Sequence, residues 1–277
     1  IIQRTSAEEQ IQIFSQIERK KEYNTVQKNE RGMAFVYYYP RFYGTPDVWY
    51  FALLVAMVLS MAASWHVKSV YQKYQKDHNA QGITGAQAVN EIRHRNGIYN
   101  VPVREIAGGP LTDYYDPKSN AISLSSDVYH GTSAVAVGVA CHEAGHALQY
   151  ANEYTPAKIR MAIIPVTNIG SKLAFPLILA GLLLSRFSPY LYQLVYLGII
   201  GFALCTLFQL VTLPTEFDAS RRAMENIRSF HILQEEEAEK ANKVLRAAAM
   251  TYVAALAVSA LQLLRFLALY GGGRRRR

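Results

Sequence analysis

Charged residues are scarce in this chain. Of its 277 residues, 18% are Asp, Glu, Lys or Arg, whereas 51% are hydrophobic. A charged fraction this low excludes a disordered or fibrous chain and is unusual for a cytosolic globular protein. The mean hydropathy is only +0.01, because the apolar residues lie in a few long blocks and the charged residues crowd between them. The composition therefore indicates a membrane protein.

Cysteine is also scarce. The chain has two cysteines, which cannot build a disulfide framework. Cys205 lies inside an apolar block, so a disulfide partner for it would have to be embedded in the membrane. We expect Cys141 and Cys205 to be free thiols that serve as small buried residues.

The excess of positive charge comes largely from one end of the chain. The formal net charge is +8, but four arginines form the terminal run Arg274–Arg277, and +8 less these 4 leaves +4. A basic end just beyond an apolar helix is typical of an anchor to acidic lipid headgroups. The charge therefore predicts a lipid bilayer, and not a nucleic acid, as the partner.

Four apolar stretches are long enough to cross a bilayer. Three of them contain no charged residue, namely Val48–Trp65, Phe187–Thr215 and Ala247–Leu264. The fourth, Met161–Ser185, is interrupted by Pro165, Lys172 and Pro176. We expect Pro176 to kink that helix.

Asn168 and Lys172 lie four residues apart and so share one face of the interrupted span. A polar face inside a membrane usually points to the protein interior or to a wet cavity. The alternative is that Lys172 extends its ammonium group to the membrane surface.

The spans divide the chain into six parts. Residues 1–32 are expected to be a leader or upstream extension, an artefact of the gene model or sequence added for expression, without a functional role. The segment that opens at Met33 is typical of a natural beginning. Four spans place the two main polar segments on the same side of the membrane. The other predicted parts are residues 33–65 with the first span, 66–160 with the catalytic region, 161–213 with two spans, 214–246 as a helical segment, and 247–277 with the last span and the basic tail.

The first polar segment mixes helices and strands. Residues 85–96 are expected to form a helix, and 101–105 and 120–125 to form short strands. Thr132 or Ser133 is expected to cap a helix that runs to about Tyr150. The strand at Ala121–Ser125 is either a site for pairing with an extended substrate or an ordinary strand of a small sheet.

The pattern H-E-x-x-H occurs at His142, Glu143 and His146. On a helix, the i, i+4 spacing puts both imidazoles on one face, where they can bind a single Zn²⁺ at about 2.0–2.1 Å. Glu143 is offset by one helical step, about 100°, so its carboxylate lies where it can take a proton from a metal-bound water. The alternative is a soluble helix with two hydrogen-bonded histidines and an exposed glutamate.

A catalytic zinc site needs a third protein ligand. Glu216, Asp218 and His231 are candidates in the second polar segment. Pro214 suits the first turn of a helix, and on that helix Glu216 and Ser220 would share a face. Asp218 would point elsewhere, and His231, after the expected helix end, is more typical of a solvated histidine.

Several separated motifs, in order, resemble one family. They are Leu111–Pro117, Ile122–Ser125, the H-E-x-x-H pattern, Pro165–Ser171 and Glu216–Arg222. Together they are similar to the YugP-type membrane zinc peptidases, also called zinc-dependent neutral proteases type 2. The resemblance covers about Met33 to the C-terminus.

This resemblance implies a multi-pass metallopeptidase of the bacterial inner membrane, distantly similar to the HtpX-type and prenyl-protein endopeptidases. The implied fold is mainly α, with membrane-embedded helices and a small α+β zincin-like catalytic region that carries H-E-x-x-H on a helix. One catalytic Zn²⁺ would be bound by His142, His146 and Glu216. Ser220 stands where those relatives have a carboxylate that orients a zinc histidine, so Asp218, Asp113 or a backbone carbonyl are the expected substitutes.

The predicted reaction is metal-assisted peptide hydrolysis with Glu143 as the residue that activates water. The group that stabilises the oxyanion stays open among several candidates. The expected substrates are peptides or membrane proteins, because the site lies beside the membrane surface. The oxyanion candidates are Tyr114, Tyr115, His130, Arg221 and Arg222.

Two other classes of protein compete with this interpretation. A non-catalytic scaffold or quality-control adaptor would use zinc for structure, but such a site needs a fourth His or Cys, and Cys141 points about 100° away from its neighbour His142. A transporter would need further buried ionisable residues in the spans, which offer almost none. Eleven Lys and Arg residues near the spans lie on the catalytic side against seven on the other, which favours a cytoplasmic catalytic face.

Overall fold

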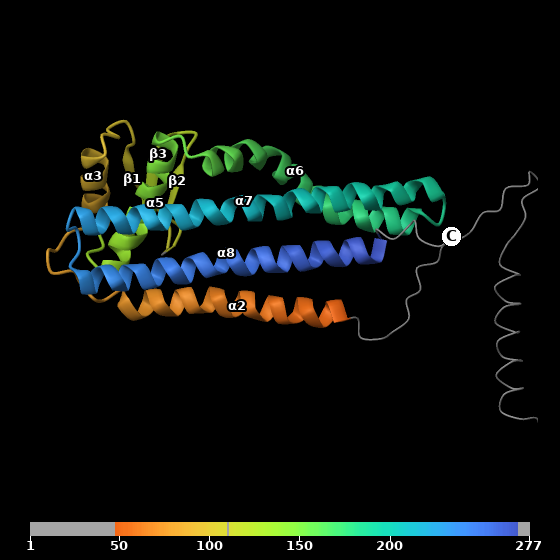
Figure 1. Cartoon of the computed structure of the whole chain (residues 1–277), viewed down its shortest axis with the longest axis horizontal. Helices are drawn as coiled ribbons and strands as arrows, with labels where there is room; N and C mark the ends of the chain where they lie inside the picture. Colours follow the sequence, from red (N-terminus) through yellow and green to blue (C-terminus); the bar gives the residue numbers. More distant parts are fainter. Residues whose placement is uncertain (1–47, 110, 271–277) are drawn as a thin grey trace, which may run out of the picture. The chain divides into compact units, whose positions relative to one another are not determined.

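A computed structural model describes residues 48–109 and 111–270 of the chain (Figure 1). The described residues belong to one compact unit that begins at Pro46, and the expected extension at residues 1–32 lies outside them. The mainly α fold with a small sheet is confirmed. Its elements are α2 Val48–Tyr74, α3 Gly85–Arg95, β1 Val103–Ile106, β2 Tyr114–Asp116, β3 Ala121–Ser125, α4 Ser126–Tyr129, α5 Ala134–Ala151, α6 Thr155–Leu184, the 3₁₀ helix η1 Pro189–Tyr192, α7 Gln193–Ser229 and α8 Glu235–Tyr270.

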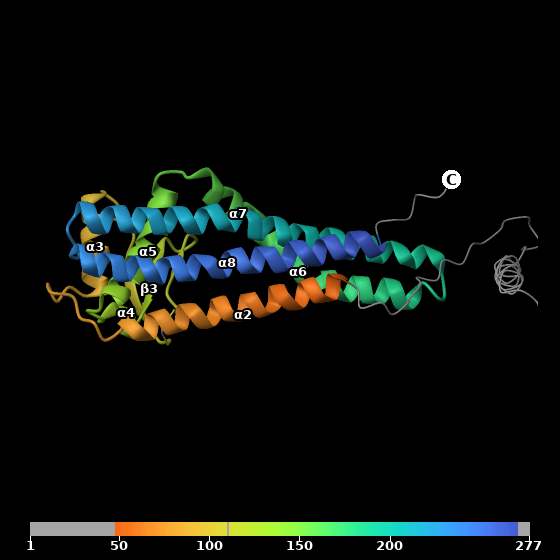
Figure 2. The same ribbon diagram turned by 60° about the horizontal axis from the view of Figure 1, so that its bottom comes forward.

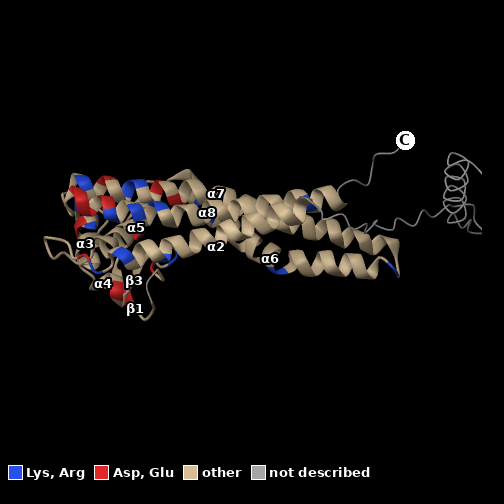
Figure 3. Ribbon diagram, turned by 90° about the horizontal axis from the view of Figure 1, so that it is seen from below, with Lys and Arg blue, Asp and Glu red and all other residues tan. Residues whose placement is uncertain are grey.

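Four helical stretches in the described part of the chain are long and apolar enough to cross a membrane: α2, α6, η1 with α7, and α8. They cover the four predicted spans except for Ser185, Phe187 and Ser188, and all four also run on into the polar segments. The 37 residues of α7 correspond to about 55 Å of helix, well beyond the roughly 30 Å of a bilayer's hydrocarbon core. Charged residues gather at the end of the unit that carries α3, α5 and the sheet (Figure 3).

The expectation that a helix begins at Pro214 is wrong, because Pro214 lies inside the continuous helix α7. A proline inside a helix removes one backbone hydrogen bond, which neighbouring helices and hydroxyl side chains can offset. Here the next residue, Thr215, is fully buried and donates its hydroxyl to the Val211 carbonyl oxygen at 3.1 Å. The predicted boundaries at 213/214 and 246/247 therefore fall within helices.

The contacts between the spans follow the order α2, α8, α7, α6, which Figure 1 shows; Figure 2 shows the same helices from another side. Prolines 165 and 176 lie within α6. The Asn168 and Lys172 side chains of α6 are both exposed. The interpretation in which this face turns to the protein interior is therefore wrong, because the packed face of α6 carries small and apolar residues such as Ala174 and Ile178.

The sheet has the strand order β1-β3-β2. β3 lies in the middle, parallel to β1 and antiparallel to β2, and all five of its residues are buried. The interpretation of β3 as a pairing site for substrate is therefore wrong, because both of its edges are already paired. β2 was not expected from the sequence, since its three residues adjoin the turn signal at Asp116 and Pro117.

α5 occupies the centre of the polar end of the unit and is buried along most of its length. The Ser133 side chain caps it by accepting a hydrogen bond from the Ala136 amide at 3.2 Å, as one of the two predicted caps. α5 packs against α3, α7 and α8. Its closest approach to α7 is at Gly145, where a Cβ would lie 2.4 Å from the Ala219 carbonyl oxygen.

We predict that Gly145→Ala destabilises the protein, because a methyl group at this contact must push α5 away from the α7 backbone. Overpacking of this kind costs about 1–3 kcal/mol, which thermal unfolding of the purified chain in detergent will detect as a lower Tm. Gly109→Ala is the control, since a Cβ at Gly109 meets no atom within 4 Å. An unchanged Tm for Gly145→Ala would contradict the close contact.

Candidate metal centre and active site

Three metal-ligating side chains converge where α5 meets α7. His142 and His146 lie one turn apart on α5, and their ring centroids are 4.7 Å apart. Glu216 comes from α7, and its Oε2 lies 3.3 Å from His142 Nε2 and 3.5 Å from His146 Nε2. One ligand atom from each of the three residues lies within 4.8 Å of the others.

The spacing of these atoms fits a zinc ion. Bond lengths of about 2.0–2.1 Å in a tetrahedral site put neighbouring ligand atoms about 3.4 Å apart, which matches both contacts of Glu216. Two imidazoles and one carboxylate form a donor set typical of catalytic zinc, which keeps a further position open. Of the three sequence candidates for the third ligand, only Glu216 lies at this site.

The other two candidates have different surroundings. His231 follows the end of α7, has a backbone φ of 52° and is exposed. Asp218 lies on α7 but turns away from the two histidines, and its carboxylate accepts hydrogen bonds from Arg221 and from Arg222 Nε, the latter at 2.6 Å. Asp218 is therefore not one of the metal-ligating residues.

The second nitrogen of each histidine also has a partner. His142 Nδ1 lies 3.1 Å from Ser220 Oγ, so the serine at this position takes the place of the carboxylate expected from the relatives. His146 Nδ1 lies 3.0 Å from Gln149 Oε1, an amide oxygen that can only accept a hydrogen bond. This contact assigns the proton of His146 to Nδ1 and leaves its Nε2 free to bind a metal.

Gln149 was missed by the sequence reasoning. It is fully buried, and its Nε2 donates to the Thr215 carbonyl oxygen at 2.7 Å and to Asp218 Oδ2 at 3.0 Å. Gln149 thus links His146 to Asp218. Its position three residues after His146, on the same helix face, is the only signal in the sequence that points to it.

Asp113 does not contact either histidine. Its Oδ1 accepts hydrogen bonds from the Ser125 amide at 2.7 Å and the Ser125 hydroxyl at 3.1 Å. Burial raises the pKa of the Asp113 carboxyl above its usual range, and the two hydrogen bonds from Ser125 oppose that rise. Asp113 was expected as a partner that orients a zinc histidine. It instead holds the segment before β2 to the end of β3.

Glu143 is buried beside the two histidines. Its Oε2 accepts a hydrogen bond from the backbone amide of Tyr115, in β2, at 2.8 Å. Burial raises the pKa of Glu143 to about 7, with His142 opposing and Glu216 adding to the rise. A carboxyl with a pKa near 7 can both take up and release a proton at neutral pH.

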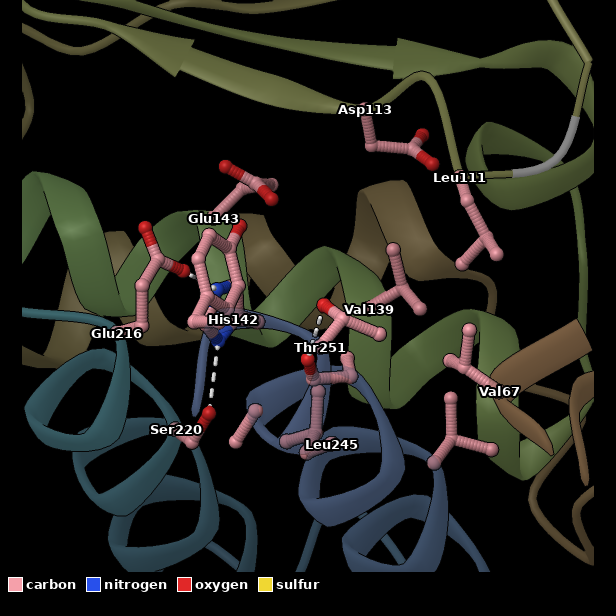
Figure 4. Close-up of a pocket in the computed structure, with 14 residues that line it drawn as sticks. Val67, Leu111, Asp113, Val139, His142, Glu143, Glu216, Ser220, Leu245 and Thr251 are labelled. Carbon is pink, nitrogen blue, oxygen red and sulfur yellow. Dashed lines mark hydrogen bonds and ion pairs between the residues drawn. The ribbon is translucent and has the colours of Figure 1, made fainter. Parts of the chain in front are cut away.

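A pocket of about 260 Å³ opens at these residues (Figure 4). The polar side chains of its lining include Asp113 and the site residues His142, Glu143, Glu216 and Ser220. The other lining residues belong to α2, α5, α8 and the segment before β2. The lining residues are Val67, Leu111, Asp113, Val139, His142, Glu143, Glu216, Ser220, Val244, Leu245, Ala248, Ala249, Thr251 and Tyr252. The α8 residues of this lining were not expected from the sequence.

The five expected oxyanion donors do not line this pocket. His130 pairs with Glu105 on the surface, and the Tyr115 hydroxyl donates to Asn120 at 2.7 Å. Arg221 and Arg222 both bind Asp218. Tyr114 is half exposed on β2.

Comparisons with known proteins cover most of the chain. The family described as "Putative neutral zinc metallopeptidase" matches residues 49–271. A protein of Bacillus subtilis (strain 168) named "Putative membrane protease YugP" is 44% identical over 224 residues, which make up 81% of this chain and 97% of that protein. No solved structure matches the chain. The region matched to the family contains every residue of the candidate metal centre.

We predict that Gln149→Leu weakens zinc binding, because His146 loses the acceptor that fixes its proton and ring orientation. Loss of such an outer partner typically costs about 10–100-fold in metal affinity, which competition with a chelator will measure. Gln81→Leu is the control, since Gln81 donates to the His231 carbonyl oxygen, away from the pocket. Equal zinc affinity of Gln149→Leu and the unaltered protein would show that Gln149 has no part in orienting His146.

Proposed function

The chain belongs to the family described as putative neutral zinc metallopeptidase, and from this premise we propose that it is a membrane-bound zinc endopeptidase. The observation that carries the proposal is the convergence of His142, His146 and Glu216 beside the buried Glu143. One zinc ion bound by the three ligands would polarise the scissile carbonyl and acidify a water molecule. The bilayer is the second partner, in keeping with the four apolar helices.

Glu143 has the position and the proton affinity of a general base. Its carboxylate lines the same pocket as His142 and Glu216, and the amide of Tyr115 holds one of its oxygens. Glu143 takes a proton from the attacking water and then delivers it to the leaving amine. The carbon–oxygen bond to water forms first and gives a tetrahedral oxyanion, and the carbon–nitrogen bond of the peptide breaks when the protonated amine leaves.

The pocket favours peptides with an apolar residue next to the scissile bond. Away from the polar site its lining is apolar, with Val67 and Leu111 among its residues. Part of this lining comes from residues 248–252 of α8, beyond Arg246, the last charge before the uncharged stretch 247–264. Membrane proteins and peptides held at the membrane surface are therefore the proposed substrates, and no nucleic acid is involved.

The alternative function is a scaffold protein with a structural zinc site. Such a site needs four protein ligands. Among the described residues, the metal-ligating group has three members. Cys141, the nearest cysteine in sequence, is fully buried in the core, and burial raises the pKa of its thiol. A raised thiol pKa opposes the thiolate form that binds zinc.

We predict that the purified chain in detergent cleaves quenched fluorescent peptides with apolar residues at the scissile bond, and that Glu143→Gln does not. The amide of glutamine cannot take the proton of water, so kcat should fall at least about 1,000-fold while zinc stays stoichiometric by elemental analysis. Glu91→Gln, at an exposed surface ion pair with Arg95, is the matched control and should keep full activity. Cleavage that survives Glu143→Gln would contradict the mechanism.

We further propose that the catalytic face lies in the cytoplasm of a bacterial cell, with the spans in the inner membrane. The excess of Lys and Arg on the catalytic side supports this orientation. The opposing observation is the run Arg274–Arg277, which follows the last span on the other side.

With four spans and a cytoplasmic catalytic face, the C-terminus must lie outside the cytoplasm. We therefore predict that alkaline phosphatase fused after Arg277 is active in bacterial cells, and that a green fluorescent protein fused there is dark. The same reporters fused within a polar loop of the catalytic side, after Gln81, should give the opposite result. A fluorescent C-terminal fusion would overturn the orientation or the number of spans.

A further inference from the structure

Hydrolysis of a peptide needs a hydrogen-bond donor for the carbonyl oxygen as it becomes an oxyanion. In the pocket, Asp113, Glu143 and Glu216 are carboxyl groups, which in their ionised form only accept hydrogen bonds. Thr251 donates its hydroxyl to the Ala248 carbonyl oxygen of its own helix at 2.7 Å. These four side chains are therefore poor hydrogen-bond donors to a substrate oxygen, and few side chains in the lining remain as candidates.

Two further hydroxyl groups line the pocket, those of Ser220 and Tyr252. Ser220 Oγ lies 3.1 Å from His142 Nδ1, on the side of that ring opposite to Nε2, which faces Glu216. Tyr252 comes from α8 and lines the same pocket as Glu143 and Glu216. Its phenol lies within hydrogen-bonding reach of the Glu216 carboxylate and close enough to Glu143 to interact with its charge.

We propose that Tyr252 is a catalytic residue that donates its phenolic O–H to the carbonyl oxygen of the scissile peptide bond. The inference rests on the proposed peptidase function. As the water oxygen bonds to the carbonyl carbon, the carbonyl oxygen gains negative charge, and the Tyr252 O–H stabilises it. Tyr252 keeps its proton throughout, because the proton of water goes to Glu143 and then to the amine that leaves.

Arg160 also contacts Glu216, and its geometry gives it a different role. Arg160 Nη1 lies 3.3 Å from Glu216 Oε1, whereas both histidines contact the other oxygen, Oε2. Arg160 is not part of the pocket lining. It therefore holds the ligand carboxylate in place, so that Tyr252 can turn from Glu216 to a substrate without freeing that carboxylate.

Tyr252→Phe in the zinc-loaded, full-length chain in detergent tests the proposal. Removal of one oxyanion donor typically costs about 100–1,000-fold in kcat. We expect a loss of that size, with KM within about threefold of its original value because the donor acts in the transition state. Tyr196→Phe, the same change at an exposed tyrosine of α7, is the control and should leave kcat unaltered.

Binding measurements distinguish a Tyr252 that stabilises the oxyanion from a Tyr252 that only maintains the structure. We expect Tyr252→Phe to weaken binding of a phosphinic peptide, which imitates the tetrahedral oxyanion, by at least about tenfold. Binding of the uncleaved peptide should be equal in Glu143→Gln and in Glu143→Gln with Tyr252→Phe. Zinc affinity, measured by competition with a chelator, should also be unchanged.

Three results would overturn the proposal: an unchanged kcat in Tyr252→Phe, an equal loss of affinity for both peptides, or a kcat restored by excess zinc. If the unaltered chain cleaves no peptide, the proposed function fails, and phosphinic peptide binding still decides the role of Tyr252. In that case, weaker phosphinic binding in Tyr252→Phe, at equal zinc affinity, supports the donor, and equal phosphinic binding refutes it.

Discussion

The candidate site depends on how closely α5 and α7 approach each other. At Gly145 the two helices meet backbone to backbone, since a Cβ there would lie 2.4 Å from the Ala219 carbonyl oxygen. Glu216 precedes Ala219 by three residues on α7, so this contact brings its carboxylate to His142 and His146. α5 meets α8 in a similar way, because a Cβ on Gly138 would lie 2.7 Å from the Ala241 Cβ. Two glycines of α5 thus allow close contacts with α7 and with α8, which also line the pocket.

Burial of polar groups at this contact would be costly without partners. The chain meets the cost with a connected network in which Gln149 joins His146 to Asp218, and Asp218 joins Arg222. Gln149 is fully buried yet uses both ends of its amide. Because each member fixes the next, the network orients the imidazole of His146 before any metal binds, which lowers the cost of ordering the site. The surface charges of Arg221 and Arg222 therefore matter to the site although neither reaches it.

Long apolar stretches and helical spacing were enough to predict the spans and the metal-binding helix. Spacing left three candidates for the third ligand, and only the resemblance to the zinc peptidase family selected Glu216 among them. The sequence was not enough to predict the roles of Gln149 and Tyr252 at the site. Both are ordinary residues in their own helices, and only the packing of α5 against α7 and α8 gives them neighbours at the site. Pro214 was misread for a related reason. Its local preference for a helix start was outweighed by tertiary packing along α7, which keeps the helix continuous on both sides of the proline.

Continuity of α7 determines where the chemistry lies relative to the bilayer. Glu216 is the first charged residue after the uncharged stretch Phe187–Thr215, and no break separates the two parts of the helix. In the proposed topology, the continuous helix places Glu216 where the apolar stretch ends, next to the membrane surface. α8 differs from α7, because Tyr252 lies six residues, or about 9 Å of helix, beyond Arg246 and so within the uncharged stretch Ala247–Leu264. In the same topology, the pocket has a charged side toward water and an apolar side toward lipid, and the proposed substrates are peptide chains that tolerate both environments.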